Sequence, residues 1–339
     1  MDIANNLLPE VIEVPYLEHE VEENTHLVKQ VRSSNRNFIE ANTIPATLDE
    51  IKEQHIIPSW AKTNEPLISH SDFVEHTYYI VKEVFHGEQI IDPSVRLSHP
   101  VKGRTFEARN LPAHLLQDNQ KTLWYQRMMF CIEIPSIQAE IDGNILNLTI
   151  GGVKSFSEDN LYQNSNGDQH FQIFIGFKNK VCTNLCLWTD GLNRSVAVKG
   201  LSGLIMNIHS LIKNYNSSHH LYHLERLTDY SLTEEQFAYM VGKLRMYQFL
   251  PSQVKKDIPE MLLTDQHINA VVKYYYRDKS FCKNGSGNIS LWKLYNLFTG
   301  ANKSSYIDSF VIRSVNAYNF VEGIKHGLDS KGTNWYLPS

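Results

Sequence analysis

Residues 300–305 combine side chains that could bind a phosphate or a carboxylate. This Gly-Ala-Asn-Lys-Ser-Ser segment lies between two stretches with the apolar spacing of helices, so we expect it to form the turn that joins them. The first turn of the second helix would present free backbone N–H groups beside two hydroxyls and the ammonium group of Lys303, a combination that suits an anion. In the alternative interpretation, Gly300 ends one helix and Ser304 or Ser305 caps the next, without any ligand.

A second candidate site is one face of a strand expected around residues 171–178. Apolar residues alternate from Phe171 to Phe177 and should face a core, which leaves Gln172, Phe174 and Lys178 on the opposite face. An aromatic ring and a cation on an open sheet can stack unpaired bases and hold phosphates. The alternative is that a helix covers this face and that Phe174 is a core residue.

Both candidates point to nucleic acid, and to single strands in particular, as the ligand. The expected phosphate contacts are Lys102, Arg104, Arg127, Lys178, Arg194 and Lys303, with Asn302 and Ser304 completing the turn and Phe174 stacking on bases. If about four cations engage, the logarithm of the affinity should fall against the logarithm of the salt concentration with a slope of about −3, at roughly 0.7 per contact.

The other motifs of the sequence do not indicate a catalytic site or a metal site. His219 and His223 would share one helical face, as the two histidines of a zinc protease do, but His220 occupies the position of the general-base glutamate and no third ligand is indicated nearby. No P-loop, dinucleotide fingerprint or nucleophile elbow is present. We therefore expect no metal and no cofactor, and a binding protein in preference to an enzyme with an unrecognised site.

Charge is distributed unevenly along the 339 residues. The formal net charge is −5, but residues 1–26 hold seven acidic residues and no Lys or Arg, so residues 27–339 carry +2. Basic residues exceed acidic ones by six to two in 96–130, by five to one in 171–213 and by six to one in 268–304. Each segment is either a basic surface for a partner or an ordinary solvated face, and the acidic head either solubilises the chain or covers one of those surfaces.

Composition and hydropathy favour a globular protein of the cytoplasm. Apolar residues make up 42% of the chain and charged residues 20%, as in ordinary globular domains. No window approaches the roughly 18 consecutive apolar residues of a membrane span, and the first residues include acids but no basic residue, unlike a signal peptide. We therefore expect no membrane among the partners.

The apolar patterning indicates an α+β fold. Residues 1–45 are predicted to be an acidic, extended tail, and residues 46–200 an α+β region whose mostly antiparallel central sheet covers about residues 128–200. Asp142-Gly143 is the favoured two-residue loop of a β-hairpin in that sheet. Residues 201–339 have the period of helices, and they either pack on the sheet as one domain or form a second one.

Several strings of residues resemble the bacterial family called domain of unknown function 3871. They are Lys-Gly-Arg at 102–104, Tyr-Gln-Arg-Met at 125–128, Leu-Thr-Ile-Gly-Gly-Val at 148–153, Phe-Ile-Gly-Phe at 174–177, Val-Cys-Thr-Asn at 181–184, Thr-Asp-Gly at 189–191 and Leu-Trp-Lys-Leu-Tyr-Asn-Leu-Phe-Thr-Gly-Ala-Asn-Lys-Ser-Ser-Tyr at 291–306. The segments at 181–184 and 291–296 are also similar, more distantly, to phage/plasmid-like proteins of another family of unknown function. The resemblance implies a cytoplasmic protein carried by conjugative or prophage elements, and it supplies no activity, catalytic residue or cofactor.

Three hypotheses of function follow from the sequence. The first is an accessory protein that binds nucleic acid, because such transactions dominate the machinery of mobile elements. The second is a protein-binding module that acts on a host factor, which the acidic head and the nearly neutral body suit equally well. The third is an enzyme whose site the motifs do not reveal.

Overall fold

The computed structural model describes residues 37–41, 43–54, 67–155, 168–329 and 334–338. At residues 101, 102, 113, 122–125, 194 and 195 it describes the backbone without the side chain. The seven acidic residues of segment 1–26 lie outside the described residues.

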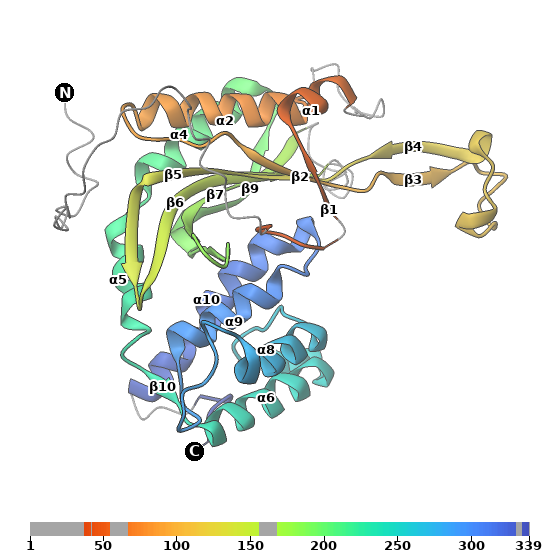
Figure 1. The fold of residues 1–339 in the computed structure, drawn as a ribbon. Coiled ribbons are helices and arrows are strands. Elements are labelled where there is room, and N and C mark those ends of the chain that lie inside the picture. The colour runs from red at the N-terminus through yellow and green to blue at the C-terminus, as the bar shows by residue number, and fades with distance from the viewer. Residues whose placement is uncertain (1–36, 42, 55–66, 156–167, 330–333, 339) are drawn as a thin grey trace, which may run out of the picture.

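A seven-stranded antiparallel sheet forms the centre of the fold (Figure 1). Its strands are β1 (Thr43–Ala46), β2 (Ser94–Ser98), β5 (Met128–Ile141), β6 (Asn144–Lys154), β7 (Gln169–Asn179), β8 (Leu185–Cys186) and β9 (Leu192–Val198), in the order β1-β2-β5-β6-β7-β8, with β9 also paired to β7. The β5–β6 hairpin turns at Asp142 and Gly143, whose φ angles of 48° and 72° are those of a type I′ turn. The predicted antiparallel sheet is confirmed, and β1 and β2 extend it beyond β5.

Helices cover both faces of this sheet. α2 (His70–Val84) and α4 (Leu201–Asn214) lie over one face, with α1 (Leu48–Gln54) beside α2, and α10 (Ile307–Asp329) passes under the other face (Figure 1). Two glycines of β6 permit the close packing. A Cβ on Gly152 would lie 2.3 Å from the ring of Phe73 on α2, and one on Gly151 would lie 2.5 Å from the ring of Phe174.

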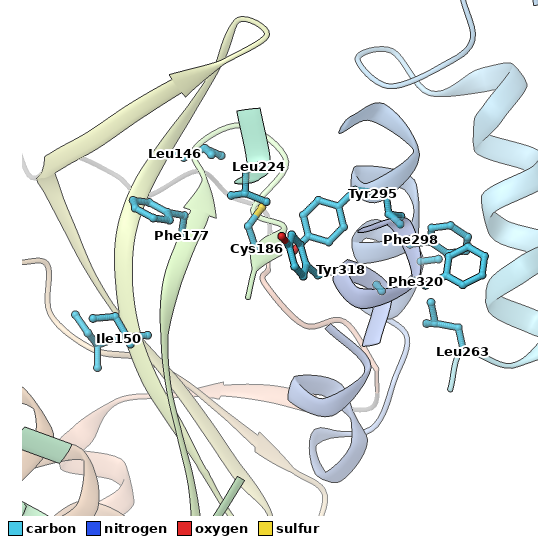
Figure 2. Packing of buried hydrophobic residues seen from close by; sticks show 14 of the residues in the cluster. Leu146, Ile150, Phe177, Cys186, Leu224, Leu263, Tyr295, Phe298, Tyr318 and Phe320 are labelled. Atoms are coloured by element: carbon cyan, nitrogen blue, oxygen red, sulfur yellow. The ribbon is translucent and has the colours of Figure 1, made fainter. Parts of the chain in front are cut away.

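Among the described residues after 200, the regular elements are helices and one short strand pair, β10 (Ser231–Leu232) with β11 (Ile289–Ser290). The helices are α4, α5 (Ser217–Arg226), α6 (Glu234–Phe249), α7 (Ser252–Lys255), α8 (Asp265–Arg277), α9 (Leu291–Asn302) and α10. The predicted α+β fold with a helical C-terminal region is confirmed. One buried apolar cluster runs from Ile150 and Phe177 of the sheet to Phe298 and Phe320 of the helices (Figure 2), and the domain boundary at residue 200 stays a prediction.

A separate two-stranded ribbon projects from the body (Figure 1). β3 (Val101–Arg104) pairs antiparallel with β4 (Lys121–Tyr125), and the short 3-10 helices η2 (Ala113–Leu115) and η3 (Asp118–Gln120) lie in the loop between them. We call residues 101–125 the arm. No described side chain of the arm belongs to the buried apolar clusters of the body, so the arm is an appendage to the fold.

Candidate functional site

The turn at residues 300–305 is not shaped as predicted. α9 continues through Gly300 to Asn302, and α10 begins only at Ile307. The Ser304 hydroxyl donates back to the carbonyl of Ala301 at 2.9 Å, and the Ser305 hydroxyl donates to Asn302 Oδ1 at 2.7 Å. The predicted helix end at Gly300 is therefore wrong, and so is the capping of the next helix by Ser304 or Ser305, because both hydroxyls bond to the end of α9.

Lys303 and Asn302 hold the fold together instead of facing solvent. The Lys303 ammonium is buried and donates to the carbonyl of Cys182 and, at 2.9 Å, to Thr183 Oγ1 in the loop before β8. The Asn302 amide donates at 2.9 Å to the carbonyl of Phe310 and at 2.9 Å to Ser314 Oγ. A phosphate at these two residues would have to displace buried hydrogen bonds, so the predicted anion site at the turn is wrong.

The predicted open face of the third strand is closed. Phe174 on β7 is fully buried and belongs to the same apolar cluster as Phe310 and Val311 of α10. Lys178 is also buried and forms an ion pair with Glu133 on β5. The stacking role predicted for Phe174 and the phosphate contact predicted for Lys178 are both wrong, because a helix covers this face as the alternative interpretation stated.

The other side chains that were predicted to contact phosphate lie in different surroundings. Arg127 forms an ion pair with Asp308 at the start of α10. The side chains of Lys102 and Arg194 lie outside the described residues, although the backbone places Lys102 on β3 and Arg194 on β9. Arg104 is exposed on β3, two residues after Lys102. Of the predicted cations, Lys102 and Arg104 therefore lie in the arm.

The arm presents an exposed aromatic ring beside a cation. Phe106 is 74% exposed, and the guanidinium carbon of Arg109 lies 4.0 Å from the centre of its ring. Arg104 Nη1 orders the loop by donating to the carbonyls of Leu111 and, at 3.4 Å, of Arg109. The sequence marked the basic excess of this region but not Phe106, because the loop has neither the alternation of a strand nor the spacing of a helix.

The excess of positive charge is concentrated in the arm. The arm holds four basic residues against two acidic ones, a net of +2, which equals the net charge of all of residues 27–339. Within it, Lys121 forms an ion pair with Asp118 at 2.5 Å. The rest of the chain beyond residue 26 is therefore neutral in sum, and the arm carries its excess of positive charge.

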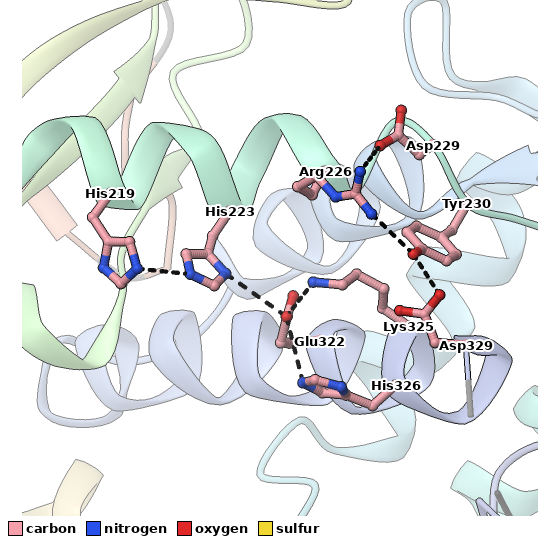
Figure 3. A network of polar contacts seen from close by, with 9 residues as sticks. All are labelled: His219, His223, Arg226, Asp229, Tyr230, Glu322, Lys325, His326 and Asp329. Carbon is pink, nitrogen blue, oxygen red and sulfur yellow. Dashed lines mark hydrogen bonds and ion pairs between the residues drawn. The ribbon is translucent and has the colours of Figure 1, made fainter.

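A second polar constellation connects α5 to α10 (Figure 3). The Nε2 atoms of His219 and His223 lie 3.1 Å apart, and Nδ1 of His223 lies 3.8 Å from Oε1 of Glu322. Lys325 and His326 also contact Glu322, His326 at 3.6 Å. Burial lowers the pKa of His223, while the carboxylate of Glu322 acts in the opposite direction. Among the residues that the structure describes, no three or more His, Cys, Asp or Glu side chains are placed to hold a metal ion.

A cavity of about 280 Å³ opens where the β5–β6 hairpin tip meets the helical region. Its described lining is Asp142, Thr228, Ser231, Asn284, Asn288, Ser290 and Lys293. This lining includes one carboxylate, that of Asp142, one ammonium group, that of Lys293, and no histidine.

Residues 21–337 match the model of one protein family, described as "Domain of unknown function, B. Theta Gene description (DUF3871)". The chain belongs to this family. Neither curated proteins nor solved structures provide a match. The DUF3871 match spans the sheet, the arm and the helices, so the arm is inside the part of the chain that the family model covers. No described helix of this family member is long and apolar enough to cross a membrane.

Proposed function

We propose that this chain is an accessory protein that binds single-stranded nucleic acid through its arm. The observation that carries the proposal is the exposed Phe106 ring with the Arg109 guanidinium over it, at the end of a projecting and positively charged ribbon. Single-strand binding proteins use the same pair of elements, aromatic rings for bases and cations for the backbone. The proposal keeps the ligand class that the sequence indicates and moves the contact surface from the sheet to the arm.

The shape of the arm supports this assignment. A two-stranded ribbon is narrow enough to enter a groove or to lie along a strand. Several DNA-binding proteins place such ribbons in a groove, and architectural proteins insert apolar side chains between bases. Leu111 and Leu115 are also exposed in the loop that holds Phe106, so this loop presents further apolar side chains to a partner. The resemblance to proteins of mobile and prophage elements supports the same ligand class by association only.

The proposal is tested by the binding of a fluorescently labelled single-stranded oligonucleotide to the full chain, followed by anisotropy. We expect Phe106→Ala to weaken binding about tenfold or more, since base stacking contributes about 1–3 kcal/mol per base. Tyr79→Ala on α2 is the matched control, because Tyr79 is also an exposed aromatic residue, at 68%, but lies on the body. Binding that is undetectable at low salt, or equally weakened by both substitutions, would contradict the proposal.

Removal of the arm tip gives an independent test. Replacing residues 105–120 by Asn-Gly would join β3 to β4 through a two-residue hairpin loop. Because the described arm side chains contribute nothing to the apolar clusters, the melting temperature of the body should change little. Loss of binding with an unchanged melting temperature supports the arm as the contact surface, and retained binding excludes it.

The alternative partner is a host protein, and the exposed Leu111 and Leu115 are the observation that favours it. Apolar side chains at the end of a projecting loop suit a groove on a protein as well as unpaired bases. A purified complex whose protein partner remains after nuclease treatment, and is lost from the variant without residues 105–120, would favour this second function.

A further inference from the structure

Helix α6 is apolar on two opposite sides. Its inner side is buried and packs through Phe237, Met240, Leu244 and Tyr247. Its outer side carries Tyr239, Gly242, Met246 and Phe249, which follow one another at intervals of three, four and three residues. These intervals place the four residues on one stripe of the helix, which we call the α6 seam.

The seam is exposed although its composition is that of an interface. Phe249 is 87% exposed and Met246 57%, and a Cβ on Gly242 would meet no atom within 4 Å. A surface helix normally carries charged or polar residues on the side opposite its buried face. Single exposed apolar residues are ordinary, but three aligned on one helix, with a glycine between them, mark a surface for another helix.

We infer that the α6 seam binds the same seam of a second copy of this chain, with the two helices antiparallel. In this arrangement the two-fold axis passes near Leu244, so that Gly242 lies opposite Met246 of the partner subunit. The absent side chain at Gly242 leaves the notch into which the long, flexible methionine fits. Tyr239 then lies opposite the partner's Phe249, and both pairs occur twice by symmetry.

Charge favours the antiparallel orientation. Glu235 lies in the first turn of α6 and Lys256 follows soon after its end, whereas Glu234 is paired with Lys283 and Lys255 donates to the carbonyl of Gln248. Antiparallel helices bring the acidic end of each copy toward the basic end of the other and oppose the two helix dipoles, whereas parallel helices would place like charges together.

The two cations that flank the seam near the axis contact groups of their own chain. Arg245 forms an ion pair with Asp265 at 2.9 Å, and the ammonium of Lys243 lies 4.5 Å from the centre of the Trp335 ring and 5.4 Å from that of the Tyr239 ring. Both are therefore held by groups of their own chain and do not oppose the approach of a second copy.

The test is the mass of the full chain in solution across the micromolar range, measured by sedimentation equilibrium. We expect a dimer, and we expect Met246→Glu to weaken its association at least tenfold. Met206→Glu is the matched control, because Met206 is also an exposed methionine, at 71%, but lies on α4. Circular dichroism of both variants shows whether the fold is intact.

Gly242→Leu separates the interface from the stability of the subunit. The position is open in the single chain, and leucine is a better helix former than glycine, so the melting temperature measured at dilution should not fall. The same side chain fills the notch and should weaken association at least tenfold. A wild-type monomer, a dimer that survives Met246→Glu and Gly242→Leu, or a monomer that dimerises only after removal of residues 1–36 would each overturn the inference.

Discussion

Lys303→Ala tests whether the lysine of the turn after α9 serves the fold or a ligand. The Lys303 ammonium is buried and donates to the carbonyl of Cys182 and to Thr183 Oγ1. A hydrogen bond from a charged donor contributes about 1.5–3 kcal/mol, and the alanine variant leaves both acceptors without this donor. Removing the cation also removes the cost of burying it, so we expect a net loss of about 3 kcal/mol in the free energy of unfolding.

Urea denaturation of the full chain measures this loss, with Lys293→Ala as the control. Lys293 is on the same helix, partly exposed, and forms no ion pair among the described residues, so its substitution should change stability by less than about 0.5 kcal/mol. Oligonucleotide binding by the folded Lys303→Ala variant should be unchanged. A loss below about 0.5 kcal/mol, or weaker binding with unchanged stability, would refute the structural role and restore the anion site.

Three further predictions concern the core. Phe174→Ala should lower the free energy of unfolding by about 3–5 kcal/mol in urea titrations, because the ring is buried under α10. Lys178→Met should cost about 3–5 kcal/mol, since it leaves Glu133 buried without its ion-pair partner, and the additional change Glu133→Leu should recover much of that loss. Burial lowers the pKa of His220 to about 3, below its unfolded value of about 6.5. Between these two pH values the unfolded chain binds one more proton at His220 than the folded chain, so stability should fall as the pH is lowered through this window. His220→Asn should flatten the dependence of the urea midpoint on pH.

Local patterns predicted the elements of the fold, because each of these patterns is a property of neighbouring residues. Asp142-Gly143 gives a type I′ turn in any antiparallel hairpin, and the apolar stripe of α4 is complete within one helix. Alternation along β7 identified one buried face correctly. It could not show that the opposite face is also buried, since this depends on α10, more than 130 residues later.

The candidate site was less predictable because it depends on contacts between distant residues. The sequence predicts that Lys178 is a surface cation. Its ion-pair partner Glu133 lies on another strand, 45 positions away. The sequence also predicts that Gly300 ends a helix. In the structure Gly300 lies inside α9, where a Cβ would approach the side chain of Asn184. The arm joins β3 and β4 through a loop of 16 residues, far longer than the two to five residues of hairpins with a recognisable turn.

The basic side chains of this chain divide according to what they contact, and the division decides where a phosphate can bind. Lys178 and Lys303 are buried against acceptors of their own chain, and releasing either to a ligand would leave those acceptors unsatisfied in the interior. Arg109 of the arm is not buried in this way, since its guanidinium lies over the exposed ring of Phe106. If its four basic residues are the only phosphate contacts, the salt dependence of binding should have a slope no steeper than about −3, at roughly 0.7 per contact. A steeper slope would require cations of the body, and hence a contact surface that extends beyond the arm.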